Sequence, residues 1–82
     1  MKAITNKADR ILEIKRLLRL GEIAQAKVEF NYNGTKVINP MQQSAATRIF
    51  RQAWGLQGEM LPQEVISLHT EVINELRNEQ IN

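Results

Sequence analysis

The chain has 82 residues, a net charge of +2 and no cysteine, and 43% of its residues are hydrophobic. A chain of this length holds one domain at most, and this hydrophobic content is typical of a folded protein. The lack of cysteine excludes disulfide bonds and thiolate zinc sites. We therefore expect a single small domain over residues 1–82, with residues 1–5 and 79–82 frayed.

No apolar run approaches the roughly 18 residues that are needed to cross a bilayer. The first ten residues, MKAITNKADR, also lack the apolar core of a secretory signal. On these grounds we expect a cytoplasmic protein that does not bind a membrane.

The charges are unevenly distributed along the chain. Residues 1–51 hold ten Lys and Arg residues and four acids, whereas residues 52–82 hold one base and five acids. Such asymmetry indicates either a surface for nucleic acid or an acidic partner, or two ends that neutralise each other within the fold or across a dimer.

The first expected helix begins after Asn6, a suitable N-cap, and runs to about Leu20, where Gly21 would end it. Its apolar side chains share one side of the helical wheel and are Ile11, Ile14, Leu17 and Leu18. A basic side is formed by Lys15, Arg16 and Arg19. The apolar side predicts packing on the core, and the basic side is either solvated or a contact surface.

Two interpretations remain open for residues 22–39. The segment KVEFNYNGTKVI predicts a β-hairpin, because Asn33-Gly34 suits a type I′ turn and apolar residues alternate with polar ones before it. The alternative is a second helix over residues 22–32, with Ile23, Ala26 and Phe30 as its stripe. We favour the hairpin and leave residues 22–26 open between the two states.

The clearest helix start in the chain is Asn39-Pro40, an N-cap followed by a proline at the first helical position. Gln42 is placed to reach back to the cap, and Gly55 is a plausible left-handed end after Trp54. The expected buried half of this helix consists of Ala45, Ala46, Ile49, Phe50, Ala53 and Trp54. The opposite side is small, polar and positive, and consists of Ser44, Thr47, Arg48 and Arg51.

A loop with two glycines separates this helix from a last one, which Pro62 opens and which extends to about Asn78. Its inner stripe consists of Val65, Leu68, Val72 and Leu76, widened by Ile66, His69 and Ile73. Glu64, Glu71 and Glu75 run beside it as an acidic row. The wide apolar side of this helix makes a homodimer possible.

The sequence contains no catalytic, metal or cofactor motif. One histidine, one aspartate and no cysteine leave no nucleophile with its base, and no glycine-rich phosphate loop is present. His69 lies on the apolar side of the last helix, where a structural role is far more common than catalysis. We therefore expect no enzyme, no cofactor and no bound metal.

The candidate contact surface for a partner or nucleic acid centres on Arg48 and Arg51. Guanidinium and hydroxyl groups on one helix face suit phosphate or carboxylate oxygens. The candidate residues are Ser44, Thr47, Arg48 and Arg51, extended by Lys15, Arg16, Arg19 and Trp54. Tyr32 and Met60, which lie at element ends, are further candidates for protein contact.

We predict a small α+β domain in the order helix, β-hairpin, helix, helix, with the later helices packed on the first; the alternative is an all-α four-helix domain. The expected function is that of a non-enzymatic regulator that binds a larger protein or nucleoprotein complex. Short proteins of this kind include phage and mobile-element inhibitors of host defence proteins. The alternative is a small repressor-like protein that binds DNA or RNA through a basic helix face.

Overall fold

The computed structural model describes residues 6–81. Its elements are α1 (Lys7–Ala26), β1 (Glu29–Tyr32), β2 (Thr35–Ile38), α2 (Pro40–Gly55) and α3 (Pro62–Ile81). The chain is thus a small α+β domain with the predicted order of helix, hairpin, helix and helix. The all-α alternative is wrong, since residues 29–38 form two antiparallel strands.

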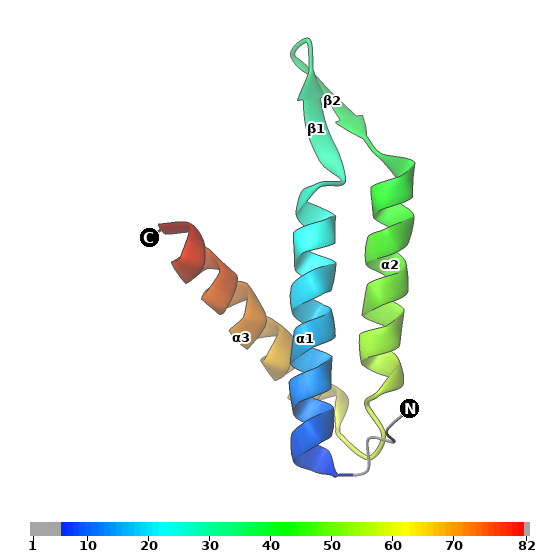
Figure 1. Cartoon of the computed structure of the whole chain (residues 1–82), viewed down its shortest axis with the longest axis vertical. Coiled ribbons are helices and arrows are strands. Elements are labelled where there is room, and N and C mark those ends of the chain that lie inside the picture. The colour runs from blue at the N-terminus through cyan, green and yellow to red at the C-terminus, as the bar shows by residue number, and fades with distance from the viewer. Residues whose placement is uncertain (1–5, 82) are drawn as a thin grey trace.

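Helices α2 and α3 both pack against α1. Helices α1 and α2 lie side by side and antiparallel, while α3 starts beside the lower end of α1 and leans away from it toward the C-terminus (Figure 1). The β-hairpin joins α1 to α2 and extends beyond both helices along the longest dimension of the molecule, which measures 49 × 29 × 24 Å.

The core forms where α1 meets the other two helices. Ile14 and Leu18 of α1 are fully buried, together with Ala53 of α2 and Val65 of α3. Most of the predicted stripes are confirmed: Leu17 and Val72 are also buried, and the partly buried residues packed around them are Ile11, Ile49, Phe50, Leu56, Leu68 and Leu76. Trp54, which was expected on the buried side of the central helix, is instead 37% exposed, because it lies in the last turn of α2, at the margin of the part that the other helices cover. Ile66, which was expected to widen the α3 stripe, is instead 54% exposed, because α1 covers only one side of α3.

The predicted helix starts are confirmed. The side-chain oxygen of Asn6 accepts a hydrogen bond from the Asp9 N–H at 2.7 Å. The side-chain oxygen of Asn39 accepts from the N–H groups of Met41 and Gln42. The Asn39 N–H donates to the Val28 carbonyl at 2.7 Å, so the hairpin base, and not the predicted Gln42 side chain, satisfies this group.

The predicted end of the first helix is wrong, because α1 continues through Gly21 to Ala26 and residues 22–26 are helical. Helix α2 ends at Gly55 as predicted, but Gly55 does not have the positive φ of the expected left-handed end. Gly21 is buried against the ring of Phe50. Close packing, and not a left-handed backbone conformation, therefore explains why this residue is glycine. Helix α3 also extends past Asn78, so residues 79–81 are helical; residues 1–5 and 82 lie outside the described part.

The hairpin turn follows the sequence prediction. Asn33 and Gly34 have φ angles of 52° and 80°, the left-handed values that a type I′ turn requires at both central residues. Phe30 pairs with Val37 and Tyr32 with Thr35, which places these four side chains on one face of the ribbon. Within residues 6–81 the ribbon has only these two strands, and most of its side chains are exposed.

Candidate functional site

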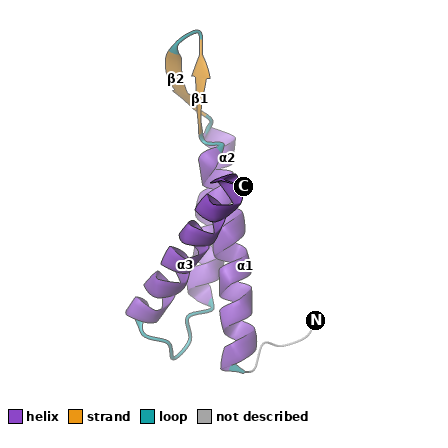
Figure 2. Ribbon diagram, turned by 90° about the vertical axis from the view of Figure 1, so that its left-hand side faces the viewer, coloured by secondary structure: helices purple, strands orange, loops and turns teal. Residues whose placement is uncertain are grey.

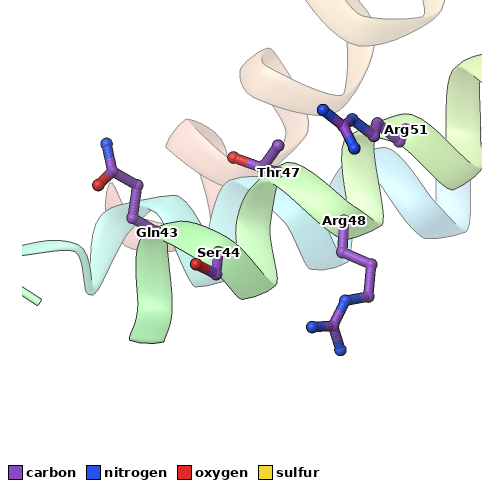
Figure 3. A pocket seen from close by; sticks show the side chains of 5 residues that line it. All are labelled: Gln43, Ser44, Thr47, Arg48 and Arg51. Atoms are coloured by element: carbon purple, nitrogen blue, oxygen red, sulfur yellow. The ribbon is translucent and has the colours of Figure 1, made fainter. Parts of the chain in front are cut away.

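The outer side of α2 carries the central candidate residues. Ala46 and Ala53 point into the core with no exposed surface, and the helical period therefore turns the opposite side to solvent. That side forms an open groove, which we call the Arg48–Arg51 face (Figure 3). The residues that line it are all exposed and are Gln43, Ser44, Thr47, Arg48 and Arg51.

The two arginines of this face diverge. In Figure 3, the Arg48 side chain points to one side of α2, whereas Thr47 and Arg51 point to the other. A single small anion would require both guanidinium groups to converge on it. The arrangement therefore suits two separate acidic groups on an extended surface better than one compact anion.

The positive charge of the Arg48–Arg51 face has no compensation nearby in the sequence. The segment 30–58 contains no Asp or Glu, although it carries Lys36, Arg48 and Arg51. Within the described residues, neither arginine of the face takes part in an ion pair. The lack of acidic residues in 30–58 can be read from the sequence. It locates the uncompensated positive charge more narrowly than the difference in charge between residues 1–51 and 52–82 does.

The basic residues of α1 have a different environment. Lys15 lies 3.0 Å from Glu75 and 3.4 Å from Glu71, and Arg19 pairs with Glu79. These contacts form a charged seam between α1 and α3, and Lys7 extends it with Glu64 at 3.6 Å. The seam confirms that the basic half and the acidic half of the chain neutralise each other in part within the fold.

Arg16 is also paired, but within its own helix. Its guanidinium donates hydrogen bonds to the Glu13 carboxylate one turn earlier. This contact lowers the pKa of Glu13 and raises that of Arg16, while hydrogen bonding to Glu75 and then Glu71 raises the pKa of Lys15. The structure thus places Lys15, Arg16 and Arg19 apart from the Arg48–Arg51 face and gives each an internal acidic partner.

The aromatic candidates differ in exposure. Trp54, at the end of α2, is 37% exposed, and Tyr32, next to the hairpin turn, is 66% exposed. Met60 is buried in the core at 6% exposure, so the expectation that it contacts a partner is wrong. Met60 lies in the loop before α3, where its N–H donates to the Gln57 carbonyl and its carbonyl accepts from Gln57 Nε2, while its side chain joins the core.

Additional apolar side chains reach the surface near the start of α2. Met41 is 82% exposed and Ile38 is 53% exposed, and Met41 adjoins Ser44 and Arg48 in a second shallow groove. Sequence reasoning missed them because an apolar residue in a strand or helix is first assigned to the core. The signal available was the isolated hairpin, which has too few strands to bury two faces.

The described residues offer little for metal binding or catalysis. No cluster of three His, Cys, Asp or Glu side chains occurs within residues 6–81. Glu71 and Glu75 share Lys15 between them. The His69 ring lies 5.5 Å from the Phe50 ring, and its Nε2 contacts the Glu22 carboxylate, which is a bridge between α3 and α1.

Comparisons of the chain with protein families, curated proteins and solved structures gave no significant match. None of the helices within residues 6–81 is long and apolar enough to span a membrane.

Proposed function

We propose that this protein is a non-enzymatic interaction protein that places the Arg48–Arg51 face of α2 on an acidic surface of a larger protein. The observation that carries the proposal is the pair of exposed arginines without an acidic partner in a segment that contains no acid. Arginine is enriched at protein interfaces, where its charge is satisfied by carboxylates of the partner.

The same observation weighs against nucleic acid as the main partner. Affinity for duplex DNA increases with the number of phosphates that Lys and Arg side chains neutralise. The internal pairing of Lys15, Arg16 and Arg19 leaves Arg48 and Arg51 as the unpaired part of the candidate basic surface. Two phosphate contacts would provide little affinity at physiological salt, whereas a mixed surface with Met41 beside the arginines suits a protein.

The mechanism that this surface supports is steric. A small rigid domain docked through α2 would cover the acidic patch that its partner uses for another ligand. A phage or mobile-element inhibitor of a host protein, including a protein that handles nucleic acid, would act in this way. The protein would then need no catalytic group of its own.

The test uses Arg48→Glu with Arg51→Glu in a pulldown from host lysate, with and without nuclease. We expect the wild-type protein to capture a partner in both conditions and the double variant to lose it, while its circular dichroism stays unchanged. Lys36→Glu with Arg77→Glu reverses the same number of charges at two exposed residues that form no ion pair among residues 6–81, and should retain capture. Equal capture by wild type and the Arg48/Arg51 variant would contradict the proposal.

Salt dependence separates the two classes of partner. Binding to duplex DNA would weaken with a log–log slope of about −0.9 for each phosphate neutralised. We expect no mobility shift of DNA or RNA at low salt. A shift that is abolished by Arg48→Glu with Arg51→Glu would instead assign the face to nucleic acid.

A further inference from the structure

Helix α1 has a second apolar side that faces away from the core. Leu12 is 67% exposed, Leu20 is 42% exposed and Ile23 is 40% exposed. At about 100° per residue these three positions fall in one arc of the wheel, opposite the buried Ile14 and Leu18. We call this arc the outer stripe of α1.

The outer stripe is open to solvent in this chain. In Figure 2, α1 forms the right-hand edge of the helical part of the molecule, and α3 and α2 lie on its other side. A helix that is apolar on both sides is normally packed on both sides. The inner stripe of α3, whose width makes a homodimer possible, packs on α1 through Val65 and Val72, although Ile66 at its margin stays exposed. On α1, by contrast, three large apolar side chains are exposed in one arc.

The charges that flank the outer stripe are arranged in order. Asp9 and Glu13 lie in its first half, Arg16 lies near its middle and is paired with Glu13, and Lys27 follows its last apolar residue. Two such helices packed antiparallel would oppose the acidic end of one to the basic end of the other, whereas parallel packing would oppose like charges. The pattern is thus complementary to itself in one orientation.

We propose that a second copy of this chain packs on the outer stripe, with the two α1 helices antiparallel across a twofold axis. One register pairs the charges at the two ends of the stripe. It places Asp9 opposite Lys27 of the second copy and Leu12 opposite Ala24, while Ile23 lies opposite Glu13 and Leu20 opposite Arg16. A closed twofold pairing of this kind uses the same patch on both subunits.

Arg16 fits the centre of this interface. Its guanidinium is already held by Glu13 of its own chain, so the charge is not left unpaired when a neighbour approaches. Its aliphatic stem can cover Leu20 of the second copy while the head group stays at the rim. The stripe from Asp9 to Lys27 is about 27 Å long at 1.5 Å per residue. An interface of one helix pair is at the small end of the usual range, so the dimer is reversible.

Dimerisation through α1 leaves the proposed partner site unobstructed. Helix α2 packs on the core side of α1, where Phe50 contacts Gly21, and so it lies away from the outer stripe. The dimer would present two Arg48–Arg51 faces. Dimerisation needs no other partner, so the dimer and the proposed function can be tested separately, and the failure of one does not contradict the other.

The first test is sedimentation velocity of the wild-type chain at protein concentrations up to about 1 mM. This range detects even a weak dimer with a Kd of about 1 mM. We expect a monomer–dimer equilibrium for wild type and monomer only for Leu20→Glu, with unchanged circular dichroism. Leu61→Glu alters a more exposed leucine before α3, away from α1's outer stripe, and should still dimerise. A wild-type chain that remains monomeric throughout, or a Leu20→Glu variant that dimerises normally, would overturn the proposal.

The second test addresses the antiparallel register. Asp9→Lys alone should weaken dimerisation by roughly 3- to 10-fold, because each dimer would contain two like-charged pairs at its rim. Asp9→Lys combined with Lys27→Asp restores opposite charges in the antiparallel register and should recover the wild-type Kd. If the double swap dimerises no better than Asp9→Lys, the proposed pairing is wrong.

Discussion

Gly21 shows how a single residue joins two helices. It lies inside α1, and a Cβ atom built on its backbone would be 2.6 Å from the nearest ring carbon of Phe50. The absent side chain lets α2 approach α1 closely, and the Phe50 ring in turn contacts His69 of α3. One position thus connects all three helices, although the residue type alone is more often read as a helix end.

The two helical glycines should therefore respond oppositely to the same substitution. Gly21→Ala gains about 1 kcal/mol of helix propensity but forces the Phe50 ring to move, an overpacking cost of about 1–3 kcal/mol, so we expect net destabilisation. Gly55→Ala meets no atom within 4 Å and should stabilise by about 0.5–1 kcal/mol. Urea unfolding of both variants measures the difference; a stabilised Gly21→Ala would contradict the packing role.

At the scale of elements, α3 is held to α1 by two kinds of contact. Val65 and Val72 are buried, and each such side chain contributes about 1.5–3 kcal/mol. The ion pairs of the seam are largely exposed, and pairs of this kind contribute about 0–1 kcal/mol each. Apolar burial therefore provides most of the docking energy, while the seam favours one register of α3 on α1.

Removing Lys15 should weaken this docking in a pH-dependent way. Lys15→Met keeps the apolar stem but leaves Glu71 and Glu75 together without a cation, and we expect a loss of up to about 1 kcal/mol near neutral pH. Hydrogen bonding to Glu75 and Glu71 raises the pKa of Lys15 above its ordinary 10.5. The stabilisation is therefore complete below pH 10.5 and is lost as the pH rises through the raised pKa.

Thermal unfolding across pH measures this effect. The difference in stability between wild type and Lys15→Met should shrink in strongly alkaline solution. Lys36→Met, which removes an exposed lysine that has no ion pair among the described residues, should show no difference at any pH. A Lys15→Met deficit that grows with alkaline pH would be inconsistent with the raised pKa.

The whole molecule consists of a packed helical part and a projecting arm. The hairpin contributes no residue to the core cluster, and its four-residue strands are exposed except for a half-buried Val37. Val28, at its base, is 3% exposed, and its carbonyl accepts the Asn39 N–H. The arm is thus anchored at its base, and its outer part can change without disturbing the helices.

Substitutions in the outer part of the arm and at its base should differ in their effect on the free energy of unfolding. Phe30→Ser with Tyr32→Ser changes exposed side chains, and we expect the free energy of unfolding to stay within about 0.5 kcal/mol of wild type. Val28→Ala removes buried methyl groups and should cost about 2 kcal/mol. Chemical denaturation of both variants gives the comparison. If the double serine variant lost as much stability as Val28→Ala, the strands would have to be packed against the helical part.

The sequence alone determined which elements form, because their signals are local. Asn6 and Asn39-Pro40 marked helix starts through hydrogen bonds within one turn, and Asn33-Gly34 marked the hairpin through backbone conformation. It also identified Arg48 and Arg51 as exposed, since the buried alanines of the same helix fix the opposite side.

The tertiary structure decided what depends on neighbours distant in the chain. Gly21 was expected to end the first helix, but whether a helix continues past a glycine depends on what packs there, and Phe50 lies 29 positions beyond Gly21. The separation of Lys15 and Arg19 from the Arg48–Arg51 face follows from the glutamates of α3, 60 positions away. Ion pairing and close packing act through space, and so only the folded chain shows which charges and which apolar side chains remain free.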